Sequence, residues 1–189
     1  MDWIRLSRDR YPLHYRKIKF EDCQLWKLNN GRIQHHTGGF FSVVGLRSHF
    51  QKLNGSTFEQ PMIDQPEIGV LGFVVRQSEN GWDWLLHAKT EPGNTNGTQI
   101  GPTVQATKSN YMQLHGGKPT EMLELFLTSN QAIHVFVDIE QSEQGDRFLG
   151  KYNRNMVIEV PFNFKQPSAE LYKWFSGKSL KESLLENFT

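Results

Sequence analysis

Residues 93–117 form a polar stretch that reads GNTNGTQIGPTVQATKSNYMQLHGG. Eleven of its twenty-five residues are Asn, Gln, Ser or Thr, five are Gly, and none is Asp or Glu. Amide and hydroxyl side chains both donate and accept hydrogen bonds, which suits a neutral polar ligand or a phosphate. Hard divalent cations prefer several carboxylate ligands, so this stretch alone does not indicate a calcium or magnesium site.

The segment TVQATKSNY within this stretch alternates in the manner of a β-strand. A period of two places Gln105, Thr107 and Ser109 on one side, with Val104 and Ala106 opposite. One face would then carry hydrogen-bonding groups for a ligand. The alternative is a solvated strand edge between two Gly-rich turns.

Strands are expected on either side of this stretch. Segments 68–77 and 81–90 are rich in apolar residues and flank an Asn-Gly turn, which predicts a β-hairpin. Segments 40–46, 134–140 and 155–160 are rich in Val, Ile and Phe and predict three more strands. A mixed or antiparallel sheet follows.

Helices are expected mainly towards the C-terminus. Segment 179–188 has a Ser and a Glu in capping-box spacing and apolar residues that share one helical face. Segment 168–175, SAELYKWF, predicts a second helix, and segment 119–127 predicts a third. We therefore expect an α+β fold, and we expect residues 1–189 to form one domain.

Composition narrows the class of protein. Twenty-one Lys and Arg stand against twenty Asp and Glu, with no basic block that would follow a nucleic-acid backbone. The longest apolar run, GVLGFVV, is too short to span a membrane, and the N-terminus has no signal-peptide pattern. Cys23 is the only cysteine, which excludes an intrachain disulfide and a multi-thiolate zinc site. We expect a cytoplasmic protein without nucleic-acid or membrane partners.

Four segments carry a resemblance to a known family. Residues 35–45 (HHTGGFFSVVG), 60–75, 85–117 and 142–160 resemble the sugar-nucleotide (NDP-hexose) 2,3-dehydratases, and the similarity extends over nearly the whole chain. The resemblance implies a Nudix-like α+β fold around a mixed sheet. It also implies a site without metal ions, and the sequence has no Glu-rich REXXEE helix.

Two features depart from the family pattern. The family's enzymes carry two tandem copies of the module and this chain carries one, so we expect two chains to pair as a homodimer. Gly39 stands where the family pattern leads us to expect Lys or Arg. This departure implies the loss of one phosphate or sugar contact.

The implied reaction needs no cofactor. In a nucleotide-linked 4-keto-6-deoxyhexose, the thymidine-linked sugar being favoured, the carbonyl acidifies the C3 hydrogen, and the enolate expels the C2 hydroxyl as water. The product tautomerises to a 3,4-diketo-2,6-dideoxy sugar. The resemblance nominates Lys89, Glu91 and Tyr111 as catalytic residues, which would supply a base, an acid and an oxyanion donor. The alternatives are a strand-end ion pair for Lys89 and Glu91, and a packed aromatic for Tyr111.

The resemblance also nominates a substrate-binding set. Diphosphate recognition favours forked cations, and hydroxyl recognition favours amides and hydroxyls. The expected binding residues are His36, Asn94, Gln105, Thr107, Ser109, Asn110, His115, Arg147, Asn153, Arg154 and Asn155. Trp82 and Trp84 could stack on a nucleobase, but two alternate Trp residues are more often part of a core. A non-catalytic sugar-nucleotide binding module is the alternative function.

Overall fold

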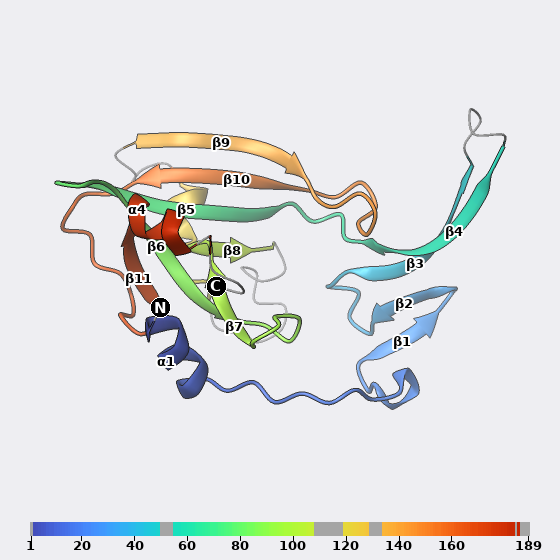
Figure 1. The fold of residues 1–189 in the computed structure, drawn as a ribbon. Coiled ribbons are helices and arrows are strands. Elements are labelled where there is room, and N and C mark those ends of the chain that lie inside the picture. The colour runs from blue at the N-terminus through green and yellow to red at the C-terminus, as the bar shows by residue number, and fades with distance from the viewer. Residues whose placement is uncertain (1, 50–54, 108–118, 129–133, 184, 186–189) are drawn as a thin grey trace.

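The computed structural model describes residues 2–49, 55–107, 119–128, 134–183 and 185 (Figure 1). The helices are α1 (Asp2–Arg10), the 3-10 turn η1 (Phe20–Asp22), α3 (Glu124–Leu127) and α4 (Gly177–Ser183). A four-stranded sheet contains β1 (Trp26–Asn29), β2 (Arg32–His35), β3 (Ser42–His49) and β4 (Thr57–Asp64). A seven-stranded sheet contains β5 (Gly69–Ser78), β6 (Gly81–Thr90), β7 (Thr98–Gly101), β8 (Val104–Ala106), β9 (His134–Ser142), β10 (Tyr152–Glu159) and β11 (Tyr172–Ser176).

The seven-stranded sheet is mixed and has the path β11-β6-β5-β10-β9. β5 and β10 run parallel, and the other pairs are antiparallel. The predicted hairpin is confirmed as β5 and β6, which meet at Gly81 with a φ of 104°. This positive φ is the conformation that a glycine adopts without steric cost. The α+β class is confirmed.

The hairpin opens beyond Val74 and Leu85. β6 then pairs with β7, and β5 pairs with β8. The fully buried Thr103 lies at this fork, where its hydroxyl accepts a hydrogen bond from Val74 N (2.9 Å) and donates to Leu85 O. One side chain thus satisfies two backbone groups that lose their partners where the strands separate.

The core lies on the face of this sheet that packs against α3. Phe126 of α3 is almost fully buried, and its ring lies directly over Gly72 of β5. A Cβ added at Gly72 would approach Phe126 Cε1 to 2.2 Å. The absent side chain is therefore what allows the helix to approach the strand.

Gly72→Ala is expected to lower the free energy of unfolding by about 1–3 kcal/mol, because Phe126 must leave its packed position. Gly45→Ala is a matched control, since Gly45 also lies in a strand and nothing lies within 4 Å of its added Cβ. Urea unfolding midpoints measure both changes. Equal midpoints for the two variants would contradict the packing argument.

The four-stranded sheet extends away from the seven-stranded one (Figure 1). Ile63, near the end of β4, connects the two sheets. Its N donates to Arg147 O (2.7 Å), and Leu149 N donates to Ile63 O (2.9 Å). An isolated parallel bridge pairs Ile63 with Phe148. The segment between β9 and β10 therefore holds the end of β4 next to the seven-stranded sheet.

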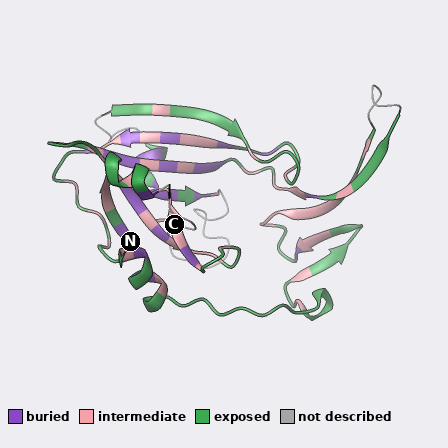
Figure 2. Cartoon of the chain, in the orientation of Figure 1, coloured by how far each residue is buried: buried purple, intermediate pink, exposed green. Residues whose placement is uncertain are grey.

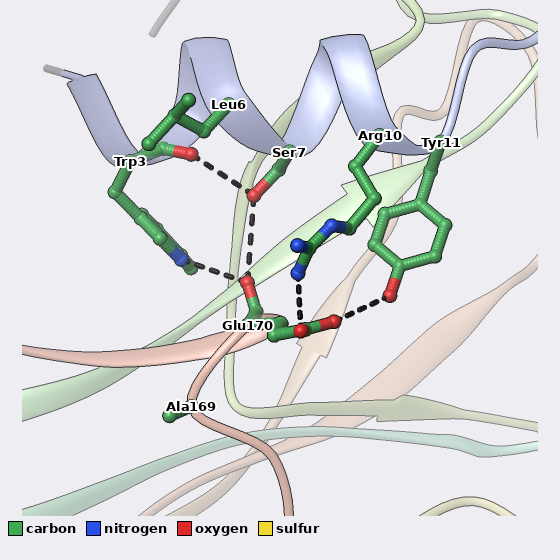
Figure 3. A pocket seen from close by; sticks show the side chains of 7 residues that line it. All are labelled: Trp3, Leu6, Ser7, Arg10, Tyr11, Ala169 and Glu170. Carbon is green, nitrogen blue, oxygen red and sulfur yellow. Dashed lines mark hydrogen bonds and ion pairs between the residues drawn. The ribbon is translucent and has the colours of Figure 1, made fainter.

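Glu170, which precedes β11, makes several contacts that hold helix α1. The Glu170 carboxylate accepts a hydrogen bond from Tyr11 Oη (3.0 Å) and forms an ion pair with Arg10. Its carbonyl accepts from Trp3 Nε1 at 2.9 Å (Figure 3). These contacts line a cavity of about 260 Å³ and occupy its polar groups. Arg8 Nε also donates to Thr98 O (2.9 Å), which ties α1 to β7.

One predicted helix is wrong. Segment 168–175 contributes β11, in which Tyr172 is buried and Lys173 is exposed. Pairing with β6 favours a strand, and the aromatic residues there suit a sheet surface. The C-terminal helix is confirmed over its described part as α4, and segment 119–127 contains the short helix α3.

Burial differs sharply between strands (Figure 2). β5 is mostly buried, whereas eight of the nine residues of edge strand β9 are exposed. None of the described helices is long and apolar enough to cross a membrane.

Candidate active site

Lys89 and Glu91 meet at the C-terminal end of β6. Lys89 Nζ lies 3.0 Å from Glu91 Oε1, with side-chain exposures of 24% and 42%. Asn94 holds the following turn, because its Nδ2 donates to Lys89 O and Gly97 O, both at 3.1 Å. The predicted binding residue Asn94 is thus engaged with the backbone that carries the predicted catalytic pair.

Two aromatic rings stack beside this pair. His87 lies two residues before Lys89 and therefore on the same face of β6. Its ring stacks on Tyr172 of β11, with centroids 4.4 Å apart and an interplanar angle of 18°. Glu121 lies close enough to Tyr172 to raise the pKa of its phenol. We call these five residues, His87, Lys89, Glu91, Glu121 and Tyr172, the β6–β11 cluster.

The environment of the cluster keeps its rings neutral. Burial, followed by the positive charge of Lys89, lowers the pKa of His87 to about 4, and Glu91 opposes this shift. Burial, followed by Glu121, raises the pKa of Tyr172. Desolvation disfavours the charged form of each group. At neutral pH, the cluster therefore presents an uncharged imidazole and an uncharged phenol.

The low pKa of His87 predicts a pH dependence of stability. The unfolded chain takes up a proton at His87 near pH 6.5, whereas the folded chain does so near pH 4. The stabilising contribution is complete above about pH 6.5 and is lost as the pH falls towards 4; it is on the order of 2 kcal/mol. Urea unfolding at several pH values should show a smaller acid loss in His87→Phe. Identical pH curves for both proteins would contradict this assignment.

A second group of predicted residues lines a small cavity at the other side of the sheet. This cavity has a volume of about 160 Å³, and Gln105, Thr107 and Asn153 contribute to its wall together with Glu143 and Lys151. Asn153 Oδ1 accepts from Gly69 N (3.1 Å), and its Nδ2 donates to Glu143. We call it the amide cavity.

Arg154 is already paired in the structure. Its Nε and Nη2 donate to the two carboxylate oxygens of Asp138 at 2.6 and 2.7 Å, across the β9–β10 pair. The hydrogen bond from Arg154 lowers the pKa of Asp138. A bidentate guanidinium of this kind has the geometry that also suits a phosphate.

Strand parity divides the predicted residues between two faces. Lys89 and Arg154 lie on the face that packs against α3, because they alternate in phase with the core residues of their strands. Gln105, Asn153 and Asn155 have the opposite parity. The predicted cluster of Asn153, Arg154 and Asn155 is therefore not a single binding surface.

The remaining predicted residues are dispersed. His36 is exposed next to β2, where its ring contacts that of His35 at 4.5 Å. Arg147 is exposed in the connection between β9 and β10. Ser109, Asn110, Tyr111 and His115 lie outside the described residues. Within the described part of the chain, no group of three or more His, Cys, Asp and Glu is placed to hold a metal ion.

Comparison with known proteins decides the family. Residues 1–188 match the family model described as NDP-hexose 2,3-dehydratase. The chain belongs to this family. It is 44% identical over 153 residues to a protein of Streptomyces violaceoruber named dTDP-4-dehydro-6-deoxy-alpha-D-glucopyranose 2,3-dehydratase. The matched region covers 80% of this chain and 33% of that protein. Proteins with the same name from Amycolatopsis orientalis and Saccharopolyspora spinosa are 39% and 41% identical, with 84% of this chain covered in each case.

This member of the NDP-hexose 2,3-dehydratase family spans about a third of the length of those relatives, 33–35% of each. Among solved structures it is similar to one titled "Crystal structure of ADP compounds hydrolase", with 12% identity and a TM-score of 0.48. That similarity covers 78% of this chain and 76% of the other.

Sequence reasoning missed three residues of the β6–β11 cluster in this family member: His87, Tyr172 and Glu121. His87 was within reach, because the period of two that places Lys89 on one face also places His87 there. Tyr172 was hidden by the wrong helix prediction for its segment. Glu121 had no local signal, because it meets Tyr172 only in the folded chain.

Proposed function

We propose that this chain is a lyase that removes water from a nucleotide-linked 4-keto-6-deoxyhexose. Family membership supports the reaction class, and the names of the relatives suggest the dTDP-linked sugar as the first substrate to test. The observation that carries the proposal is the contact of Lys89 with Glu91 at 3.0 Å in the signature segment 85–117. The pair combines a proton acceptor and a proton donor at one place.

In this proposal the two side chains act in sequence. The Glu91 carboxylate removes the C3 proton, and the electron pair moves into a C3–C4 double bond while the C4 oxygen becomes negative. The C4 carbonyl then re-forms, the electron pair moves into a C2–C3 double bond, and the C2–O bond breaks as the Lys89 ammonium protonates the departing hydroxyl, which leaves as water. A proton returns from Glu91 to Lys89, and general acid–base catalysis of this kind accelerates reactions by about 10²–10⁴.

A pair of chains is the second part of the proposal. One sugar nucleotide cannot lie on both faces of one sheet, yet the predicted binding residues Arg154 and Gln105 have opposite parity. His36 lies in the turn that follows β2 of the four-stranded sheet. We propose that the residues of one copy contact the substrate held by the other, in a homodimer that acts in the cytoplasm.

A product assay tests the reaction, and light scattering tests the assembly. Purified protein is incubated with a 4-keto-6-deoxy sugar nucleotide with and without chelator, the product is trapped by reduction, and its mass is measured. Loss of one water in both arms supports the metal-independent lyase. Binding without water loss would favour the binding module instead. Light scattering at the working concentration should give twice the chain mass of 21.9 kDa, and a monomer would overturn the homodimer.

A further inference from the structure

We propose that His87 is a further catalytic residue, which donates an imidazole N–H hydrogen bond to the C4 oxygen while the enolate forms. This inference rests on the proposed lyase function and assigns the oxyanion donor that the reaction needs. The step moves no proton to His87: Glu91 takes the C3 proton, and the developing C4 oxyanion accepts the hydrogen bond. Preorganised donors at a developing oxyanion commonly contribute factors of about 10²–10³.

The position of His87 supports this role. It shares the face of β6 with Lys89, two residues away, so a substrate held at Lys89 and Glu91 meets the imidazole as well. The residue opposite His87 on β7 is Gly101, which adds no side chain on that flank. The other flank is covered by the stacked ring of Tyr172. The Lys89 side chain lies beside Gly101, with its Cβ 3.7 Å from where a Gly101 Cβ would stand, so the imidazole has Tyr172 on one side and Lys89 near the other.

The hydrogen-bonding state of His87 supports it too. Within the described residues, no hydrogen bond holds the ring nitrogens of the half-buried His87. A half-buried imidazole without such a bond keeps its N–H available as a donor. A ligand oxygen held next to Lys89 would be an acceptor for that N–H.

The charges around His87 favour the neutral donor. Lys89 and Glu91 face it along β6, and Tyr172 with its partner Glu121 faces it from β11 and the segment before α3. Burial and Lys89 keep the pKa of His87 near 4, so the ring is uncharged at neutral pH. A neutral imidazole can donate to an enolate oxygen without protonating it, which preserves the negative charge that expels the C2 hydroxyl.

The backbone next to Glu121 is strained. Met122 is buried and has a φ of 60°, a left-handed conformation that L side chains rarely adopt. Strain of this kind is concentrated at functional sites, where the surrounding structure holds it. Here it lies beside Glu121, whose charge acts on Tyr172, and Tyr172 stacks on His87. Tyr172 and Glu121 are therefore positioning residues.

Two variants of His87 separate donation from packing. His87→Phe keeps an aromatic ring against Tyr172 but removes the donor, and it is expected to lower turnover about 10²–10³-fold. His87→Gln loses the stack but keeps a neutral N–H, and it is expected to stay within about tenfold of wild type. Both should keep the nucleoside diphosphate affinity of wild type, measured by isothermal titration.

Exchange at C3 gives a second readout. In deuterated water, His87→Phe should slow C3 hydrogen exchange and water loss together, because the enolate itself is destabilised. Lys89→Met should retain C3 exchange and lose only water release. The role of His87 alone would be overturned if His87→Phe turned over at the wild-type rate. It would also be overturned if a lower melting temperature and weaker nucleotide binding accounted for the defect of this variant. A wild-type protein that binds nucleotide and releases no water would overturn the lyase function, and this inference with it.

Discussion

Lys89→Met and Glu91→Gln are each expected to lower turnover by a factor on the order of 10²–10⁴ while nucleotide affinity stays almost unchanged. Each variant removes one of the two proton-transfer groups that lie 3.0 Å apart. Met and Gln have nearly the same length as the residues they replace, so the packing at the end of β6 is retained. Neither side chain is assigned to the nucleotide or the diphosphate, which explains why affinity and turnover should respond differently.

A second ion pair provides the control for this prediction. Arg47 and Glu59 lie 2.6 Å apart on the four-stranded sheet, with side-chain exposures of 75% and 63%. Arg47→Met and Glu59→Gln should leave water release unchanged, because exposed ion pairs contribute little to stability and this pair is far from β6 in the sheet order. If the Lys89 and Glu91 variants released water as fast as the control variants, the Lys89–Glu91 pair would have no role in the mechanism.

Arg154→Ala is expected to weaken binding of the sugar nucleotide and of the bare nucleoside diphosphate alike, by about 1.5–3 kcal/mol. This corresponds to a loss of affinity of roughly 10- to 150-fold. The guanidinium lies on the same sheet face as Lys89, and its bidentate contact with Asp138 shows that it presents two parallel donors. Isothermal titration with both ligands measures the effect.

Asp138→Asn is the matched variant for Arg154. It removes the carboxylate that competes with a diphosphate for the guanidinium, so affinity should stay the same or rise. Circular dichroism and melting temperature check that the β9–β10 pair is intact in both variants. A similar loss of affinity in Asp138→Asn and Arg154→Ala would show that the ion pair supports the strands and does not bind the diphosphate.

Several features follow from local sequence. The β5–β6 hairpin is encoded by alternating apolar residues around Asn80-Gly81, because a glycine with positive φ closes a tight turn at little cost. In β8, the alternation of Val104, Gln105 and Ala106 correctly predicts which side chains are buried. The signature segment also led to Lys89 and Glu91, whose contact depends on two residues at one strand end.

Helix and strand were confused where local preference and tertiary pairing conflict. Segment 168–175 contains Ala, Glu, Leu and Lys, which favour a helix, and the same segment contains aromatic residues that favour a sheet. The edge of β6 was free to accept a partner there, and pairing with it buries Tyr172. No local pattern specifies that an edge strand is available.

The sequence by itself determined the family, the hairpin and the residue types of the site, because these depend on motifs and on periods of two within single strands. Only the tertiary structure decided which of those residues share a surface. The register between distant strands put Arg154 on the same sheet face as Lys89. It put Gln105 and Asn153 on the opposite face. It also brought Tyr172 against His87. These contacts join residues far apart in the chain, and the free energy that selects them comes from burying the whole core, which no short segment contains.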